Sequence, residues 1–490
     1  MHIDVWDMNR LNKGLGSVLI FVLTACTSWH EAVSHVDVQP PVFPDYKDVT
    51  VPCNIAPLNF MVEGTDRIQV VITIDGEEGL KVAGKDGVIS IPLKKWRGLL
   101  DRAHGKVLQF EVSVWSDESP EGTRYAPFTV NVAPESMDPW ISYRLIEPGY
   151  VGWRQLGIYQ RDVSSFEESA IVTNRSSNTT CINCHHYPSY SPESMMFHAR
   201  GANGGTILYD RGRLKKIDFR NKGPKKNTTY PAWHPNGRYI AFSSNVTHQV
   251  FFSEGRQPIE VFDTASDLVL YDINSDKVIV DPRFMTEASL ETFPSWAPDG
   301  RSLYFASYSS PVLPVVFNKH MHYDLLRVPF DPESGTFGEK IDTLFNTRVS
   351  GGSVSYPRVS PDGSRLLYTW SEYGTFPIWH QEADLKLMDL STGNHVDVSV
   401  WNDTAAADSY HSWSSEGRWV MFGSRRIDGR YTRLYIAYLD PQGKPHKPFL
   451  LPQEDPRFNS LRLKSFNVPE FMSGKVTLPK DVSKLLDSEY

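Results

Sequence analysis

Two cysteines and a histidine stand at the spacing used for covalent haem attachment, in the segment Cys181-Ile-Asn-Cys184-His185. Two thiols at this spacing can each form a thioether with a vinyl-derived carbon on one edge of a porphyrin. The histidine that follows can then ligate the iron. The motif therefore predicts one covalent haem c, with Cys181 and Cys184 holding the porphyrin and His185 as the proximal ligand of the haem iron.

Two other interpretations of the cysteine pair are open. In an oxidising compartment Cys181 and Cys184 can form a disulfide, and in a metal site they can be half of a zinc ligand set. A structural zinc site usually needs a second ligand pair at comparable spacing. The only other cysteines are Cys26 and Cys53, so the sequence favours haem first and a disulfide second.

The sixth position of a haem iron takes a thioether or an imidazole from a nearby segment, or is left open. Met196 and His198 follow the motif on an expected strand, and the two-residue period of a strand places them on one face. We expect one of them to be the distal ligand. The alternatives are that both pack in a hydrophobic core, or that an open position serves small-ligand sensing.

The first 25 residues have the pattern of an export signal. A basic segment precedes a short apolar run, residues 14–23, which ends in Leu23-Thr24-Ala25-Cys26. This ending resembles a bacterial lipobox, which implies a lipoprotein signal peptide over residues 1–25 and lipidation of Cys26. A triacylated terminus anchors stably to a membrane. The residues after Cys26 favour the outer membrane, so we expect a protein of the cell envelope that faces the periplasm, where haem c is attached.

The next part of the chain predicts a tether and a small domain. Residues 26–47 contain several prolines and predict an extended tether. From residue 48 to 135, short apolar runs alternate with turn residues, most clearly at 67–74 and 107–115. This pattern predicts a β-sandwich of immunoglobulin-like type.

A repeat rich in aromatic residues and prolines fills residues 140–470. Its copies begin at Tyr187, Tyr230, Phe293 and Tyr356, with a worn copy at Tyr410. Later copies carry a Pro-Asn-Gly or Pro-Asp-Gly turn between two short strands, and a second strand pair follows. Two hairpins per repeat of about 40 to 60 residues indicate a β-propeller blade. The sequence predicts an all-β chain whose propeller has six blades, or alternatively seven, followed by a tail over residues 471–490.

The repeats resemble those of TolB-like propellers, and the exported chain resembles a family of TolB-like propeller lipoproteins with a Cys-x-x-Cys-His insertion. The resemblance is most specific over Cys181–His198, Tyr373–His380 and Pro452–Pro456. It implies docking of a protein partner in the periplasm or envelope. TolB itself lacks the cysteine motif, so its role in envelope integrity transfers only weakly.

Four further histidines fall in loops near expected blade ends, at His320, His322, His380 and His411. Propeller lyases acting on oligogalacturonate carry similar repeats and bind a divalent metal through several histidines and one glutamine; here Gln381 follows His380. Loops gather at the central channel of a propeller, so His322, His380 and His411 are an alternative metal site. Loop histidines are otherwise ordinary polar surface residues.

Composition and missing motifs narrow the remaining functions. The formal net charge of −8 gives no basic footprint for nucleic acid, and no apolar stretch reaches the length of a membrane-spanning helix. The sequence contains no Walker loop, G-x-S-x-G elbow or HExxH helix. It therefore favours an electron-transfer or redox-sensing lipoprotein. The alternatives are a TolB-like protein-binding scaffold with a disulfide and, last, a metal-dependent lyase.

Overall fold

The computed structural model describes residues 29–147, 155–176, 181–201, 203–222 and 228–488. The predicted signal peptide and the lipidation site at Cys26 lie outside these residues. Within the described ranges no helix is both long and apolar enough to cross a membrane. The chain is all-β, as predicted. Its described strands form one large N-terminal sheet and six smaller sheets.

The N-terminal sheet has ten strands and folds around one hydrophobic core. Along β8 and β10 the buried residues alternate with more exposed ones, and Phe60, Phe110 and Phe128 contact one another in the core. This arrangement is consistent with the predicted sandwich. Its elements are β1 (Ser34–Val36), β2 (Val42–Phe43), β3 (Val49–Val51), β4 (Phe60–Val62), β5 (Arg67–Ile74), β6 (Glu77–Lys85), β7 (Val88–Ile89), α1 (Leu93–Leu100), β8 (Val107–Ser116), β9 (Ser119–Tyr125) and β10 (Phe128–Val132).

Two segments of the predicted tether, residues 26–47, are strands of this sheet. β1 pairs in parallel with β9, and β2 pairs with β4. The hydroxyl of Ser34 also donates to the backbone oxygen of Gly122 at 3.0 Å. Because prolines interrupt this segment, it shows no two-residue period, and its pairing with the sheet could not be seen in the sequence.

The six smaller sheets follow one another along the chain, and we number them as blades 1 to 6. Each has four strands except blade 4, which has five. Blade 1 contains β11 (Trp140–Ile146), β12 (Gly157–Asp162), β13 (Glu168–Thr173) and β35 (Ser465–Met472); blade 2 contains β14 (Cys181–His186), β15 (Ser194–Arg200), β16 (Gly205–Asp210) and β17 (Arg213–Ile217); blade 3 contains β18 (Thr229–Trp233), β19 (Tyr239–Phe251), β20 (Ile259–Asp272) and β21 (Lys277–Ile279). Blade 4 contains β22 (Ser289–Trp296), β23 (Ser302–Ser309), β24 (Asp324–Asp331), β25 (Thr336–Phe337) and β26 (Asp342–Phe345); blade 5 contains β27 (Ser353–Val359), β28 (Arg365–Ser371), β29 (Asp384–Asp389) and β30 (His395–Val396); blade 6 contains β31 (Asp408–Trp413), β32 (Trp419–Ser424), β33 (Arg433–Tyr438) and β34 (Phe449–Leu450).

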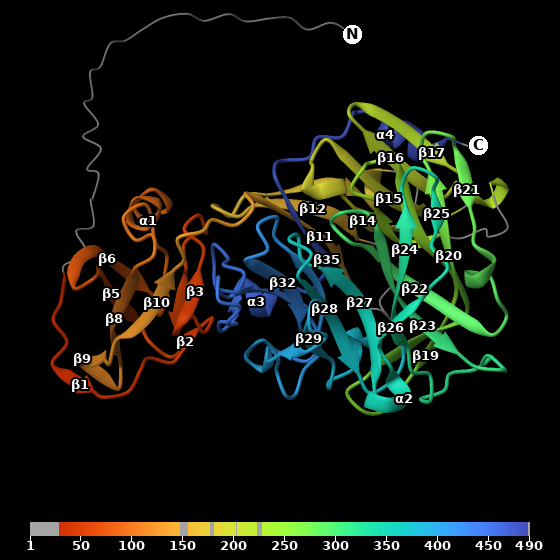
Figure 1. Ribbon diagram of the computed structural model, residues 1–490. Helices are drawn as coiled ribbons and strands as arrows, with labels where there is room; N and C mark the ends of the chain where they lie inside the picture. The colour runs from red at the N-terminus through yellow and green to blue at the C-terminus, as the bar shows by residue number, and fades with distance from the viewer. Residues whose placement is uncertain (1–28, 148–154, 177–180, 202, 223–227, 489–490) are drawn as a thin grey trace, which may run out of the picture. The chain divides into compact units, whose positions relative to one another are not determined.

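The blades close into a ring through their innermost strands, which contact one another in the order β35, β14, β18, β22, β27, β31 and back to β35. Closure depends on β35, the last strand of the chain, which pairs antiparallel with β11 (Figure 1). Blade 1 is therefore built from both ends of the propeller segment. The prediction of a six-bladed propeller is confirmed.

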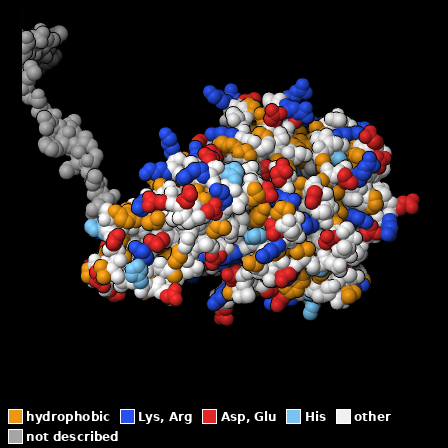
Figure 2. Space-filling view, turned by 60° about the vertical axis from the view of Figure 1, so that its left-hand side comes forward, with side chains coloured by type: hydrophobic (Ala, Val, Ile, Leu, Met, Phe, Trp, Pro, Cys, Tyr) orange, Lys and Arg blue, Asp and Glu red, His pale blue; other side chains and the backbone are white. Residues whose placement is uncertain are grey.

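The C-terminal residues take part in the fold. β35 runs to Met472, so the predicted tail, residues 471–490, begins inside a strand. The helix α4 (Val482–Asp487) contacts β17, and its Leu486 is fully buried in a core shared by blades 1 and 2. The short helices α2 (Thr347–Ser350) and α3 (Phe458–Leu461) lie in connections. On the face shown in Figure 2, acidic and basic side chains are interspersed.

Candidate functional site

Each innermost strand is interrupted by the same irregularity. Its pairing register with the neighbouring strand of its blade shifts at one point. At that point the backbone of one residue is left-handed, with φ between 47° and 55°, a conformation uncommon for residues other than glycine. We call these six residues the channel ring: Cys184, Tyr230, Phe293, Tyr356, Tyr410 and Val468.

The positions of the channel ring show that the sequence-based alignment of the first repeat with the later repeats was wrong. The sequence aligned Tyr187-Pro188 with Tyr230-Pro231, but the structure aligns Cys184-His185 with that pair. Tyr187 lies just after β14 instead. The prediction was wrong because Tyr187-Pro188-Ser-Tyr-Ser-Pro copies the local residue order of the repeat, while the register shift that defines the ring depends on pairing with β15.

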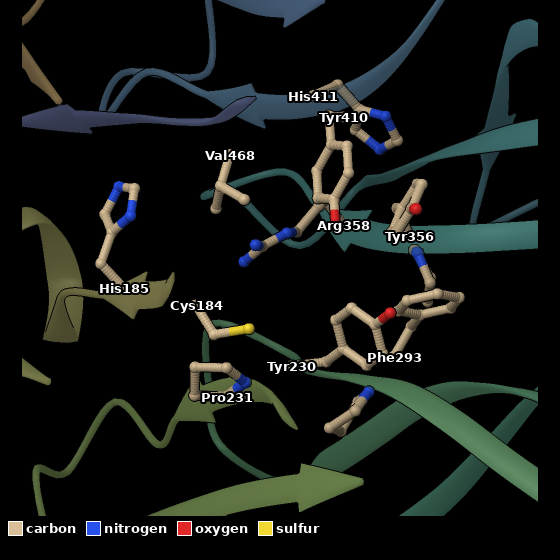
Figure 3. A pocket seen from close by; sticks show the side chains of 12 residues that line it. Cys184, His185, Tyr230, Pro231, Phe293, Tyr356, Arg358, Tyr410, His411 and Val468 are labelled. Carbon is tan, nitrogen blue, oxygen red and sulfur yellow. The ribbon is translucent and has the colours of Figure 1, made fainter. Parts of the chain in front are cut away.

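The ring is aromatic in four consecutive blades. The ring centroids of Tyr230 and Phe293 are 4.4 Å apart, those of Phe293 and Tyr356 4.4 Å, and those of Tyr356 and Tyr410 4.2 Å. Cys184 and Val468, from neighbouring blades 2 and 1, are its two small members. Figure 3 shows the thiol of Cys184 pointing toward the space enclosed by these aromatic side chains.

Two cavities meet at the ring. The small one, about 50 Å³, is lined by all six ring residues. The larger one, about 640 Å³, is lined by residues of blades 1, 2, 3, 5 and 6, and we call it the funnel. Cys184, Tyr230, Tyr410 and Val468 line both cavities. The funnel has the size of a site for a small molecule or cofactor.

Both predicted attachment residues face the funnel. Cys181 and Cys184 line its wall, are partly exposed and are free thiols. The Arg144 guanidinium of β11 lies beside Cys181, with Nη2 3.8 Å from Sγ. The predicted motif thus brings two reactive groups from one strand to one cavity.

The predicted proximal ligand is oriented differently. His185 is 1% exposed, and its Nε2 lies 3.2 Å from the hydroxyl of Ser142 in β11. Burial lowers its pKa to about 3, so the imidazole is neutral, which is the form that ligates metals. Its Nδ1 is buried and has no hydrogen-bond partner among the described residues. Figure 3 shows that the His185 and Cys184 side chains leave β14 in different directions.

The predicted distal ligands lie on the other side of blade 2. Met196 is fully buried and packs with Phe242 of blade 3. The His198 ring is 5.7 Å from that of Phe242, and its Nδ1 lies 2.9 Å from the hydroxyl of Thr206. Met196 and His198 share a face, as predicted. However, that face is directed at blade 3 whereas His185 is directed at blade 1, so the structure does not bring either residue to His185.

The residues therefore fit the thioether part of a haem site better than its axial part. Two free thiols line one cavity of suitable size, and the neutral His185 with an unpaired nitrogen has the chemistry of a ligand. In this arrangement, however, its ring packs against blade 1 rather than beside the thiols. Met196 and His198 do not fit as axial partners of His185, because the blade 2 sheet separates them.

The alternative metal histidines are dispersed. His322 Nδ1 lies 3.0 Å from the backbone oxygen of Gly352, and His411 Nε2 lies 3.0 Å from that of Leu367. His380 contacts Glu260 instead. Among the described residues, no group of three or more His, Cys, Asp and Glu side chains is placed to hold a metal ion. The structure does not bring His322, His380 and His411 together.

A long hairpin of blade 3 forms part of the funnel wall. β19 and β20 have 13 and 14 residues, and Gln249, Ile259 and Val261 line the funnel. From this hairpin Glu260 Oε2 reaches His380 Nε2 of blade 5 at 2.7 Å, and both side chains are almost fully buried. The contact ties the hairpin to the loop before β29.

The channel also contains an ion pair between two blades that are not neighbours in the ring. Arg358 of blade 5 lies two positions after the ring residue Tyr356, and its Nη2 is 3.2 Å from Glu470 Oε1 of blade 1. Its Nη1 is 3.3 Å from His186 Nε2 of blade 2. Burial raises the pKa of Glu470, and the positive charge and hydrogen bond of Arg358 offset part of this rise.

Several funnel residues were not predicted from sequence. Arg144, Arg200 and Arg425 line it, as does Trp379. The stretch Tyr373–His380, singled out by the family resemblance, was the available signal for Trp379. No sequence signal pointed to the three arginines. Each lies in or just after an ordinary strand, and the three line one cavity only because several blades are packed together in the ring.

No protein-family model matches the sequence, and no curated protein matches it. Among solved structures, TolB from Acinetobacter baumannii is 13% identical, with 77% of this chain and 85% of that chain covered and a TM-score of 0.42. An oligogalacturonate lyase in complex with manganese is 12% identical, with 63% and 72% covered and a TM-score of 0.36. The periplasmic gluconolactonase PpgL of Pseudomonas aeruginosa is 13% identical, with 62% and 81% covered and a TM-score of 0.27. The propeller assignment rests on the sheet topology of this chain itself.

Proposed function

We propose that the protein is an exported propeller that holds one covalent haem c in the funnel, for electron transfer or redox sensing. The observation that carries the proposal is the position of two free thiols, Cys181 and Cys184, on the wall of one 640 Å³ cavity. The small ring residues Cys184 and Val468 leave space beside these thiols that aromatic side chains occupy in the other blades.

The chain's own residues have distinct roles in this proposal. Cys181 and Cys184 fix the porphyrin edge to β14, while Tyr230 and Tyr410 form apolar surface that limits water at the channel end of the funnel. A bound haem supplies one-electron redox chemistry. His185 would ligate the haem iron if its side chain left Ser142.

The cellular setting belongs to the same proposal. Lipidation of Cys26 anchors the protein to the outer membrane, and export places the two thiols in the compartment where haem c is attached. The propeller offers a docking surface for a protein partner in the periplasm or envelope. The lipobox-like ending Leu23-Thr24-Ala25-Cys26 supports this placement.

The attachment is tested with full-length protein made in a host with a working haem c maturation system. Thioether bonds resist acid-acetone extraction, so the wild-type protein should stay coloured on denaturing electrophoresis. Cys181→Ala and Cys184→Ala should weaken or abolish the colour. Cys53→Ala is the matched control, because Cys53 is a partly exposed free cysteine in the turn after β3, outside the propeller. A colourless wild-type protein overturns the proposal.

The second candidate is a protein-binding scaffold in which Cys181 and Cys184 form a disulfide. The observation that favours it is the orientation of His185, which is hydrogen-bonded to Ser142 away from the thiols. Unreduced protein would then be colourless, and its mass would be lower by two hydrogens than that of the reduced protein. Two free thiols at these positions in colourless periplasmic protein would exclude this candidate too.

A further inference from the structure

The funnel wall carries an excess of positive charge. Three of its lining residues are arginines, Arg144, Arg200 and Arg425, and Glu147 is its one acidic lining residue among the described residues. None of the three arginines forms an ion pair with a carboxylate within the described part of the chain. A net surplus of two positive charges in a partly enclosed cavity attracts anionic groups.

Two of the arginines flank the thiol of Cys181. Arg200 is the direct cross-strand partner of Cys181 in the pairing of β14 with β15. Arg144 approaches the same thiol from β11, and its buried Nε has no hydrogen-bond partner in the part of the chain that the structure describes. Arg144 belongs to blade 1 and Arg200 to blade 2, so the two side chains come together only because these neighbouring blades pack against each other.

The third arginine is held in a fixed orientation at a different part of the wall. Arg425 is 5% exposed, its guanidinium carbon lies 3.3 Å from the centre of the Trp379 ring, and Nε donates to the backbone oxygen of Ile378 at 2.6 Å. Nη1 donates to the backbone oxygen of Arg430. These contacts use main-chain oxygens and an aromatic face, and the charge of Asp428 acts on the guanidinium without forming an ion pair with it in the described part of the chain. Trp379 belongs to blade 5, which stands opposite the cysteines of blade 2 in a ring of six.

We infer that the funnel recognises a planar ligand that bears carboxylates, through charge-assisted hydrogen bonds from Arg144, Arg200 and Arg425. The planar body lies against the aromatic lining, and the carboxylates pair with guanidinium groups that form no ion pair in the described part of the chain. The inference deepens the proposed function, because a haem carries two propionates. These lie on the porphyrin edge opposite the vinyl groups, so a haem bonded to Cys181 and Cys184 directs them toward Arg425, whereas a porphyrin without thioethers can also reach Arg144 and Arg200. The inference does not require thioether formation, so each can fail without the other.

The test uses wild-type full-length protein without haem and a porphyrin that cannot form thioethers. Mesoporphyrin IX has ethyl groups in place of vinyls and two free carboxylates, and its dimethyl ester has none. Both are titrated in the same detergent while porphyrin fluorescence is recorded. We expect the diacid to bind at least tenfold more tightly than the diester, which is the effect of one charge-assisted hydrogen bond.

Single variants then locate the contacts. Arg200→Gln changes an exposed side chain and Arg425→Gln a buried one; each should weaken diacid binding roughly tenfold and leave diester binding unchanged. Arg348→Gln, an exposed arginine of α2 outside the funnel, is the matched control. Should Arg425→Gln fail to fold, Arg200→Gln still decides. Equal affinity for diacid and diester, no effect of the funnel variants, or no binding of either porphyrin overturns the inference.

Discussion

Cys184 and Tyr230 occupy the same position on neighbouring innermost strands, and both have left-handed backbones, with φ of 50° and 47°. The local fold is the same in the two blades, but blade 3 fills the channel with a phenol where blade 2 offers a thiol. The position of Cys184 is therefore set by the repeated strand geometry of the propeller and not by an irregular loop. Cys184 stands at a position that the propeller repeats six times.

Completing the aromatic ring should remove the site while keeping the fold. Cys184→Tyr places at this position the residue that Tyr230, Tyr356 and Tyr410 show to be compatible with the backbone. We expect the free energy of unfolding to stay within about 1 kcal/mol of wild type, because an added aromatic contact offsets a tighter fit. Covalent haem should be lost. Urea unfolding and haem staining measure the two effects.

Cys184→Val is the control for this change, because it reproduces Val468 and removes the thiol without filling the space. It should lose covalent haem but keep binding of mesoporphyrin IX, which Cys184→Tyr should block. If both variants bind the porphyrin equally, the space beside Cys184 is not where the ligand lies.

The propeller was predictable from its repeat, because the aromatic-proline pair and the Pro-Asp-Gly turn are both formed by residues that are adjacent in the sequence. Two positions of the channel ring were not predicted because their residues differ from the repeat. Cys184-His185 was missed because the nearby Tyr187-Pro188 matches the repeat better. Val468-Pro469 was missed because it lacks the aromatic residue. Both are recognised only from the register shift, which is a property of strand pairing.

The ligand set was less predictable than the fold. Strand period correctly placed Met196 and His198 on one face, but which neighbouring blade that face meets depends on closure of the ring. The same limit applies to Arg144 and Arg425, from blades 1 and 6, whose shared cavity does not exist in either blade alone. Sequence spacing thus indicated the thiol pair and could not indicate its surroundings.

Acid should destabilise the haem-free protein through three buried histidines, His185, His198 and His411. Burial lowers the pKa of each to about 3, against an ordinary value near 6.5 in the unfolded chain. Between these values the unfolded state binds more protons, so stability falls as pH falls below about 6.5. At pH 5.5 each histidine should cost about 1.4 kcal/mol relative to pH 7.5.

Urea unfolding at pH 7.5 and 5.5 measures this loss. His411→Gln should reduce it by about 1.4 kcal/mol, the contribution of this one histidine. His320→Gln, at an exposed residue, is the control. An unchanged pH dependence in His411→Gln would show that this imidazole is not buried in its neutral form.

The ion pair between Arg358 and Glu470 should be costly to break from one side. Arg358→Met leaves the Glu470 carboxyl, whose side chain is 10% exposed, without its cation, and should destabilise the protein by about 3 kcal/mol. The double variant Arg358→Met with Glu470→Met should lose less than the sum of the single changes, because two apolar side chains can replace the pair. Additive losses in a double-mutant cycle would contradict this coupling.

The contact between Glu260 and His380 should keep the β19–β20 hairpin over the funnel up to alkaline pH. Burial alone lowers the pKa of His380, but hydrogen bonds to Glu260 and Glu382 and their charges outweigh it and raise the pKa to about 9. A raised pKa means that the stabilisation is complete below about 6.5, shrinks as pH rises and is lost above about 9. It amounts to about 3 kcal/mol at most, from the difference between the two pKa values.

Hydrogen exchange of residues 248–262, followed by mass spectrometry, reports on this hairpin. After correction for the intrinsic pH dependence of exchange, wild-type protein should show protection at pH 7 that is lost by pH 10. Glu260→Gln removes the charge that holds the His380 proton and should lose protection already at pH 7, whereas Glu372→Gln, at an exposed acidic residue next to Tyr373, should behave as wild type. Because Gln249, Ile259 and Val261 of the hairpin line the funnel, the same variant should also release mesoporphyrin IX faster. Equal protection at both pH values in wild type and Glu260→Gln would show that the contact does not hold the hairpin.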